Sequence, residues 1–468
     1  MLAAPLPALP LALPGLELAS PFCAMQMSAA VPWECFDPIL ARLAAHRDAA
    51  RLARCQQRHQ SKRDGHRAVP LIAVAAPTSR GAQPAATGRK PWPLRSLLAA
   101  FLLRPTQRVE DKVSDVHMLL SQNPVFAAAC GFRFPAVPGY RTLARFDREM
   151  RHLGFWGEVR LAAVRANFDA GVIVPEALAS VDTTHIEAEA VLGHTCPGPD
   201  GSPVPTDEHA AVLAKSAHRT FIAHKAVMIA LPHCAAPLTA LDLRGSTSDA
   251  HTLRPIAEKF RAEFPDLTAQ IREIAADGIY QTADNRAAVP EVLGPQAQLR
   301  APIHPGRTQP KPLARPGMRE LSPHGIPVCQ AGHTLRLQGR DLQRGEYLWH
   351  CPLFGVAHPD PTRTCAPELH QACCAGSAQG RTLRTPQALS PHIDWECPQP
   401  SARFRRSYRQ RARIEGSFGI LSEVFLIRRL HQRGAEAGQA HLDRTLASMH
   451  LWLYARHVLA RHQLVLAA

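Results

Sequence analysis

The sequence predicts a mixed α/β domain, with a helical domain before it and an insertion ahead of its last helices. Short runs rich in Val, Ile and Ala alternate with helical patterns over residues 171–304, which is typical of a sheet with flanking helices. Helical periodicity alone marks residues 92–170. Residues 305–402 are rich in Pro, Gly, Cys and His, and a helical section without proline follows at 403–468. A structureless loop of that length is uncommon inside a compact domain, so we expect 305–402 to be a separate module.

The composition favours a basic protein that acts on a polyanion. The 468 residues suffice for two or three domains and a substantial core. Lys and Arg number 54 against 39 Asp and Glu, which gives a net charge of +15 and a pI of about 9.7. Because Arg can direct two N–H groups at one phosphate, nucleic acid is a better partner than a membrane. No transmembrane segment is evident in the sequence, so we expect the protein to work in solution.

Residues 1–91 are predicted to hold a leader, a short helix and a flexible linker. The first 24 residues are apolar, but they lack a basic start and contain five prolines. We therefore expect a disordered leader rather than a signal peptide or a membrane span, with translation from Met25 or Met27 as an open alternative. One helix is predicted from Phe36 to Gln60. Residues 66–92, rich in Pro, Ala, Gly and Thr, are predicted to be a linker.

Residues 92–170 are predicted to form a small helical bundle that binds DNA or mediates dimerisation. Apolar residues recur at every third or fourth position, and turns are expected near Pro124, Pro135 and Pro138. Several basic positions could face DNA, although a solvated helix surface is the alternative for each. These positions are Arg89, Lys90, Arg104, Arg108, Arg141 and Arg145.

The 171–304 segment supplies the strands of the predicted sheet. The strand that leads into Asp182 and the next two strands are expected to form a meander. The first helix should turn Leu253, Ile256 and Phe260 inward. In chain order we expect strands at Val172–Val174, Ala179–Val181, His218–Ala230 and Pro237–Leu243, a helix at Asp249–Phe264, a strand at Ile271–Ala276, a helix at Gln281–Leu293 and a strand at Gln298–Ile303.

Two aspartates follow apolar strands, at positions suited to a shared site. Asp182 follows the strand Ala179–Val181, and Asp277 follows the strand Ile271–Ala276. A sheet presents the ends of its strands beside one another, and carboxylate oxygens are ligands that Mg²⁺ favours. Each aspartate also has a plainer interpretation, because either one could belong to an ordinary turn. Asp284 competes locally with Asp277, but we expect it to open the next helix.

A third carboxylate, Glu415, lies on a predicted helix of the 403–468 section. An acid held among cations stays ionised, as a metal ligand that works on phosphate must. The alternative is a surface helix on which Arg411 and Glu415 form an ordinary ion pair. At 3.6 residues per turn, one face of this helix holds Tyr408, Arg411, Glu415, Gly419 and Ser422, and an adjoining apolar stripe holds Ile414, Phe418, Leu421 and Phe425.

In their order along the chain, these segments resemble the DDE transposases of bacterial insertion sequences, over roughly residues 88–460. Three motifs carry the resemblance, and the two intervening segments 224–227 and 245–249 also match. The motifs are Val181-Asp182-Thr183-Thr184-His185, then Ala276-Asp277-Gly278-Ile279-Tyr280, then Tyr408-x2-Arg411-x3-Glu415, which is similar to the Tyr-Arg-Glu-Lys signature. Two departures stand out, since the second motif has an altered order and the lysine expected seven residues after Glu415 is Ser422.

The resemblance implies an RNase H-like catalytic core and a metal-dependent polynucleotidyl transferase. Asp182 would bridge two Mg²⁺ or Mn²⁺ ions, Asp277 would bind one of them and Glu415 the other. Water and then a 3′-hydroxyl would be the nucleophiles. Tyr408, Arg411 and Lys225 would contact the DNA.

The resemblance also implies the partners and the place of action. These are double-stranded DNA, as the terminal repeats of the element and as target DNA, and a homodimer on that DNA. The bacterial cytoplasm near the nucleoid is the expected location, with no membrane contact. Two other functions stay open. One is an inactive, zinc-stabilised DNA-binding protein derived from a transposase, which Ser422 favours, and the other is a stand-alone RNase H-like nuclease.

The insertion carries a candidate structural Zn²⁺ site. Six of the twelve cysteines lie between Cys329 and Cys397, which suits a metal site in a reducing compartment better than a disulfide scaffold. A tetrahedral thiolate site would supply folding free energy to a segment that offers little apolar core. Free structural cysteines are the alternative. The preferred ligands are Cys329, Cys351, Cys365 and Cys374, with His333 and Cys373 as substitutes.

Overall fold

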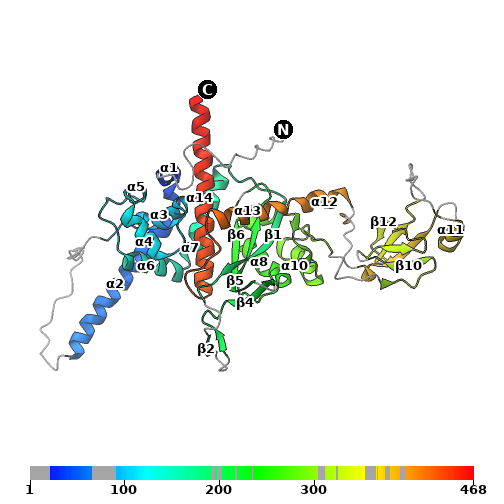
Figure 1. Cartoon of the computed structure of the whole chain (residues 1–468), viewed down its shortest axis with the longest axis horizontal. Helices are drawn as coiled ribbons and strands as arrows, with labels where there is room; N and C mark the ends of the chain where they lie inside the picture. Colours follow the sequence, from blue (N-terminus) through cyan, green and yellow to red (C-terminus); the bar gives the residue numbers. More distant parts are fainter. Residues whose placement is uncertain are drawn as a thin grey trace. The chain divides into compact units, whose positions relative to one another are not determined.

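A computed structural model describes most of the chain (Figure 1). The described residues are 22–65, 91–190, 195–197, 203–216, 219–234, 236–303, 311–322, 325–353, 365, 367–374, 380–390, 397, 399 and 401–467. Most of the expected leader and of the linker lies outside them. The chain divides into two compact units. The helical unit comprises Met1–Val174, His185–His224 and Gly419–Ala468, and the sheet unit comprises Pro175–Thr184 and Lys225–Phe418. The five predicted domains stay predictions.

The helical unit is built largely from the N-terminal helices and the last helix. The expected helices are confirmed as α2 and α3 to α7, with Pro124 at the start of α5 as a turn signal. Cys23 and Ala24, expected in a disordered leader, instead begin α1 and are fully buried. The elements are α1 (Cys23–Ala30), η1 (Trp33–Phe36), α2 (Asp37–Gly65), α3 (Leu94–Leu103), η2 (Arg104–Gln107), α4 (Val113–Gln122), α5 (Pro124–Ala129), α6 (Tyr140–His152), α7 (Phe155–Asp169) and α14 (Ala435–Ala467).

The core of the helical unit combines aromatic packing with buried ion pairs. Phe101, Phe146 and Trp156 lie with ring centroids 5.7–6.1 Å apart. Asp111 is buried beside them and accepts hydrogen bonds from Arg444 at 2.8 and 2.9 Å. Because a buried charge is costly without a partner, this pairing ties α14 to the segment before α4.

A six-stranded mixed sheet has the order β4-β5-β1-β7-β8, and β6 also pairs with β5. Strands β1, β7 and β8 are parallel, whereas β4 and β6 run antiparallel to β5. The predicted meander is confirmed in that β5 neighbours both β1 and β6, but β4 was not predicted and residues 172–174 form no strand. The strands are β1 (Leu178–Glu187), β4 (Ala211–Ser216), β5 (Arg219–Ala230), β6 (Thr239–Leu243), β7 (Glu273–Ala275) and β8 (Gln298–Arg300), with a separate pair β2 (Thr195–Pro197) and β3 (Pro203–Pro205).

Helices accompany this sheet as its alternating pattern predicts. Leu253, Ile256 and Phe260 on α8 are fully buried, which confirms the expected inward face. Figure 1 shows α8 and α10 beside the strands. The elements are η3 (Asp249–His251), α8 (Leu253–Glu263), α9 (Pro265–Thr268), η4 (Gly278–Tyr280) and α10 (Ala283–Leu293).

The insertion contains two small antiparallel sheets, β11-β10-β9 and β12-β13-β14. The expectation that it has little apolar core was wrong, because Met318, Tyr347, Trp349 and Leu383 are buried in one cluster. Its strands have two to six residues, too few for a clear alternating pattern in the sequence. The elements are β9 (Lys311–Pro312), β10 (Met318–Leu321), β11 (Pro327–Cys329), β12 (Arg336–Asp341), β13 (Glu346–His350), α11 (Pro367–Cys374), β14 (Thr382–Pro386) and η6 (Gln387–Leu389).

The helices that follow the insertion are α12 (Ala402–Arg409), α13 (Ala412–Glu423) and α14. The single helix expected over Tyr408–Ser422 is therefore interrupted. Gln410 and Arg411 lie between α12 and α13, in a stretch where the backbone hydrogen bonds run from residue i+3 to residue i. Within the described residues, none of the helices is both long enough and apolar enough to cross a bilayer.

Candidate active site

Asp182 lies on β1, and Asp277 follows β7, the parallel neighbour of β1. The pairing of β1 with β7 ends at Ser180 opposite Ala275, two residues before each aspartate. Strand β1 continues to Glu187, so Asp182 lies within its strand rather than after it as expected, whereas Asp277 comes after β7 as predicted. The charge of Asp277 acts on Asp182, so the two carboxylates are neighbours.

Asp182 lies in a confined and strongly charged environment. Its side chain is 13% exposed. It accepts hydrogen bonds from the backbone N–H of Thr183 at 2.9 Å and from the guanidinium of Arg411 at 3.0 Å. Burial raises the pKa of Asp182, the charges of Glu415 and Asp277 add to the rise, and Arg411 opposes it. The residue is part of β1 rather than of a turn. A cation near this carboxylate therefore stabilises the ionised form of Asp182.

Asp277 is exposed at the point where β7 gives way to η4. Its carboxylate accepts a hydrogen bond from the N–H of Gly278 at 2.6 Å, so it does cap a short turn. Its charge nevertheless acts on Asp182 and on Arg411. Asp284 lies in the first turn of α10, as predicted for the competing aspartate. The turn role and a role in the site are thus compatible for Asp277.

Arg411 connects Asp182 to Glu415. Its guanidinium donates to Asp182 at 3.0 Å and to Glu415 at 2.8 Å. Burial lowers the pKa of Arg411, but Asp182 and the other neighbouring acids outweigh burial, so the net shift is upward. The buried Nε of Arg411 has no hydrogen-bond partner in the described part of the chain. One guanidinium thus balances the acids that come from β1, from the end of β7 and from α13.

Glu415 is the most accessible of the partners of Arg411, with a side chain 56% exposed. The ordinary i,i+4 ion pair that was the alternative for this helix is present. Because Arg411 also reaches Asp182, the pair is part of the carboxylate cluster rather than an isolated surface contact. The apolar side of α13 packs inward through Ile414 and Leu421, which are 1% and 0% exposed. This packing holds Glu415 on the opposite side of the helix.

Tyr408, a predicted DNA contact, lies on α12 and stacks on Phe404, with ring centroids 5.8 Å apart and planes 13° apart. Burial raises its pKa, so the phenol stays protonated at neutral pH and can donate. Ser422 is half-buried on α13. DNA contact by Tyr408 stays a prediction.

Lys225 is held inside the fold. Its ammonium donates to Asp249 at 2.6 Å and to the carbonyl of Thr247 at 2.5 Å. The side chain is 9% exposed. These contacts join β5 to the loop before α8, so the two intervening segments of the resemblance do meet in space. DNA contact by Lys225 stays a prediction that would require this pairing to open.

Tyr280 is a buried neighbour of the cluster whose role the sequence did not reveal. It belongs to the second motif, and its hydroxyl lies 3.0 Å from the Oγ1 of Thr252. Burial raises the pKa of Tyr280 well above its ordinary value, the acids Asp249 and Asp182 add to this, and hydrogen bonds with Thr252 and Thr183 oppose it. Thr183 follows Asp182 on β1, so Tyr280 contacts the strand that carries Asp182. The signal in the sequence was an aromatic residue three positions after Asp277.

The structure gathers the cysteines of the insertion around its small core. Cys329, Cys351, Cys373 and Cys374 are all buried there. Burial raises the pKa of Cys329, with Cys373 as a further cause. Burial likewise raises the pKa of Cys374 to about 11, with Cys351 next.

Cys373, a substitute ligand of the predicted zinc site, is one of the buried cysteines. The N–H of Ala331 donates to its Sγ at 3.3 Å. Cys365 is half-buried, and burial followed by the charges of Cys373 and Cys351 raises its pKa. His333 is half-buried on the turn after Cys329. Soft thiolates in this number suit Zn²⁺, and the zinc site and its ligand set stay predictions.

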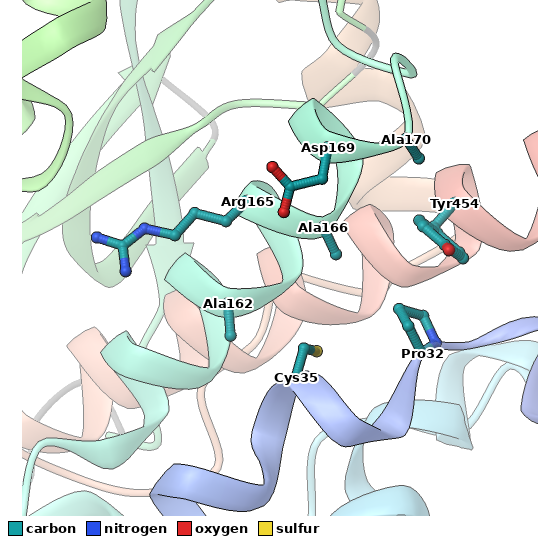
Figure 2. A pocket seen from close by; sticks show the side chains of 8 residues that line it. All are labelled: Pro32, Cys35, Ala162, Arg165, Ala166, Asp169, Ala170 and Tyr454. Atoms are coloured by element: carbon teal, nitrogen blue, oxygen red, sulfur yellow. The ribbon is translucent and has the colours of Figure 1, made fainter.

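A separate hollow of about 440 Å³ belongs to the helical unit and contains none of the predicted site residues. Figure 2 shows the guanidinium of Arg165 pointing away from Tyr454. The hollow is shallow and has one cationic and one acidic side chain, and nothing in it suggests a reaction. It is lined by Pro32, Cys35, Ala162, Arg165, Ala166, Asp169, Ala170 and Tyr454.

Comparison with known proteins gives little beyond this geometry. No protein-family model matches the chain, and no curated protein matches it. Among solved structures, the chain is similar to a piggyBac transposase, in a cryo-EM structure of its synaptic complex with hairpin DNA. The two are 10% identical, the match covers 79% of this chain and the TM-score is 0.33. The chain spans 66% of the length of that transposase chain. At that TM-score the likeness is too weak to show a shared fold.

Proposed function

We propose that this chain is a DNA transposase of a bacterial insertion sequence, which cleaves and joins DNA strands by metal-dependent phosphoryl transfer. One observation carries the proposal. Arg411 donates to Asp182 on β1 and to Glu415 on α13, and the charge of Asp277 after β7 also acts on it. Three separated motifs of the sequence thus contribute to one cluster of charges.

Carboxylates are the ligands that divalent cations favour. Mg²⁺ and Mn²⁺ prefer carboxylate oxygens, and neighbouring acids repel each other unless a cation lies among them. In this structure the oxygens of the three acids do not all lie within 4.8 Å of one another, so an ion held by all three would draw them closer. In this structure the guanidinium of Arg411 is the cation among the acids. Its Nε has no hydrogen-bond partner among the described residues, which indicates that the guanidinium fits the acids imperfectly. Asp182, Asp277 and Glu415 would hold the ions. Bound divalent ions stabilise the charge that develops on the attacking and leaving oxygens of a phosphoryl transfer.

The side chains of the chain itself have distinct tasks in this proposal. Asp182, the most enclosed acid of the three, would hold the ions away from solvent. Arg411, once released from Asp182, can direct its planar fork of N–H groups at a DNA phosphate. Tyr408 donates its phenol proton to the same backbone. Lys225 holds the loop before α8 against β5 and so positions the strand beside Asp182.

The finer features belong to the same proposal. The sheet is the core of an RNase H-like catalytic domain, and residues 92–170 bind the terminal repeats or join two subunits on DNA. Zn²⁺ stabilises the insertion. The protein acts in the bacterial cytoplasm, at the nucleoid, on element ends and target DNA.

Ser422 supports a second candidate, an inactive DNA-binding protein derived from a transposase. A lysine at that position would add one cation about two turns after Glu415 on α13, whereas serine adds none. A stand-alone nuclease would use the same three acids but would not join strands.

A strand-transfer assay distinguishes these functions. The substrate is a labelled duplex that carries the DNA flanking the coding region, with Mg²⁺ or Mn²⁺ present. Joined products support the transposase, cleavage without joining identifies a nuclease, and binding alone identifies the inactive protein. Asp182→Asn, Asp277→Asn and Glu415→Gln should each abolish joining, whereas the control Asp284→Asn should not. Full joining by Asp182→Asn would show that the site is wrongly assigned.

A further inference from the structure

Helix α2 continues beyond the residues that pack against the helical unit. At its start Leu40 and Leu43 are 6% and 0% exposed. Arg42 pairs with Glu158 on α7, and Arg47 pairs with Glu149 on α6 at 2.6 Å. Beyond these contacts the helix runs on to Gly65. Figure 1 shows its far end projecting away from α4 and α6.

Near its start, helix α2 has a buried apolar face. Further along the helix, the same face is exposed and carries cations. Starting from Leu40, the positions three or four residues apart fall within an arc of about 100° around the helix. Arg51 and Arg54 are exposed. Neither has an acidic partner among the residues that the structure describes. The positions on this arc are Leu40, Leu43, Arg47, Arg51, Arg54, Arg58 and Lys62.

We infer that this cationic stripe, through the exposed Arg51 and Arg54, binds the phosphate backbone of duplex DNA. From Arg51 to Gly65 the helix rises about 21 Å at 1.5 Å per residue, and duplex DNA carries one charge per about 1.7 Å of its axis. The fork of an arginine can engage phosphate with two hydrogen bonds, whereas Arg47, nearer the buried start of the helix, is already paired with Glu149. The stripe lies outside the 92–170 segment that the sequence assigned to DNA. The inference rests on the proposed function for its substrate.

The chemistry of the other faces excludes a membrane or a second copy as the occupant. Over residues 47–65, Leu52 is the one large aliphatic side chain, so the helix has no apolar face to insert between lipids. The two acids of this stretch, Asp48 and Asp64, lie outside the arc. A second copy would therefore bring cations against cations and offer no apolar seam.

The experiment compares full-length variants that lose the same charge. Arg51→Gln/Arg54→Gln removes two cations from the stripe, and the control Arg336→Gln/Arg340→Gln removes two exposed cations from β12. Binding of a fluorescent duplex is measured by anisotropy at a series of salt concentrations, without divalent ions. Thermal unfolding of each variant checks that the fold is intact, which is expected because all four side chains are exposed.

The stripe variant should lose two phosphate contacts. The slope of log K against log salt should fall by about 1.8, and the affinity near 0.15 M salt should fall on the order of 30-fold. The control variant Arg336→Gln/Arg340→Gln should keep the salt slope and the affinity of the wild type. An unchanged slope, an equal loss in the control, or no binding of duplex by the wild type would overturn the inference.

Failure of the stripe and failure of the proposed function give different results. If the wild type joins strands while the stripe variant binds DNA unchanged, the stripe is refuted and the transposase stands. If stripe-dependent binding is found with a protein that neither cleaves nor joins DNA, the stripe stands and the proposed reaction fails.

Discussion

Replacing Arg411 by glutamine removes the cation that balances Asp182 and Glu415, and so tests whether divalent ions can take its place. The change removes a cation that donates to Asp182 at 3.0 Å and to Glu415 at 2.8 Å. The pair with Glu415 is exposed and contributes at most about 1 kcal/mol. Asp182 is only 13% exposed, and leaving a buried charge without its partner costs about 3–5 kcal/mol. Without divalent ions, the variant should therefore be less stable by about 3 kcal/mol, which is roughly 6 °C in unfolding temperature.

Divalent ions should reverse this loss. A ligand at about a thousand times its dissociation constant stabilises the folded state by about 4 kcal/mol. In the wild type, part of that gain is offset because Arg411 must leave Asp182. In Arg411→Gln the acids are already free, so saturating Mg²⁺ or Mn²⁺ should raise the unfolding temperature by more than in the wild type.

Thermal unfolding in a chelator and then across a titration of Mg²⁺ or Mn²⁺, without DNA, measures both effects. Arg413→Gln is the matched control, because Arg413 donates to the carbonyl of Pro232 at 3.1 Å. Loss of this hydrogen bond in Arg413→Gln should lower the unfolding temperature by the same amount with and without metal. Equal stability of wild type and Arg411→Gln in the chelator, or an equal response to metal, would refute the reasoning.

Three further outcomes are expected. Because the pKa of Asp182 is raised in the folded protein, its ionisation costs folding free energy. This cost is absent below pH 3.8, the ordinary pKa of the group, and grows as the pH rises through the raised pKa. In a chelator, Asp182→Asn should thus unfold at a higher temperature than the wild type at pH 7, and the gap should close in acid; a constant gap would contradict this. Tyr280→Phe should cost about 1 kcal/mol in urea unfolding, because Thr252 loses one hydrogen bond; no change would show that this bond is not made. Purified protein should contain about one Zn²⁺ per chain, and Cys373→Ser should lose it more readily than Cys365→Ser; equal retention would leave both thiols outside the site.

The strands and helices could largely be predicted because their apolar periodicity is local. Asp182 and Asp277 were expected together because each follows an apolar run, but β1 continues past Asp182 to Glu187, so only Asp277 comes after its strand. The predicted helix over Tyr408–Ser422 was wrong at Gln410 and Arg411. The face pattern continues through that break, and no Pro or Gly marks it in the sequence.

The pairing of the cations could not be predicted. From the sequence, Lys225 and Arg411 were basic residues available to DNA, whereas the structure pairs them with Asp249 and Asp182. Those partners are 24 and 229 residues distant. Charge patterns identify which residues can form ion pairs, but only the fold decides which of them meet. The core of the insertion was missed for a related reason. The apolar residues of its short strands are buried only because those strands pack against one another in the fold.

The position of the insertion affects the order in which the chain acquires its parts during synthesis. Helix α2 and both aspartates leave the ribosome before the insertion, and Glu415 follows it. A chain that stops within the insertion would lack both the third acid and α14, whose Arg444 pairs with the buried Asp111. The helical unit, which carries α2, therefore completes its core only after the insertion has been synthesised. Under the proposed function, the DNA-binding stripe and the third acid would thus become available at the same late stage of synthesis.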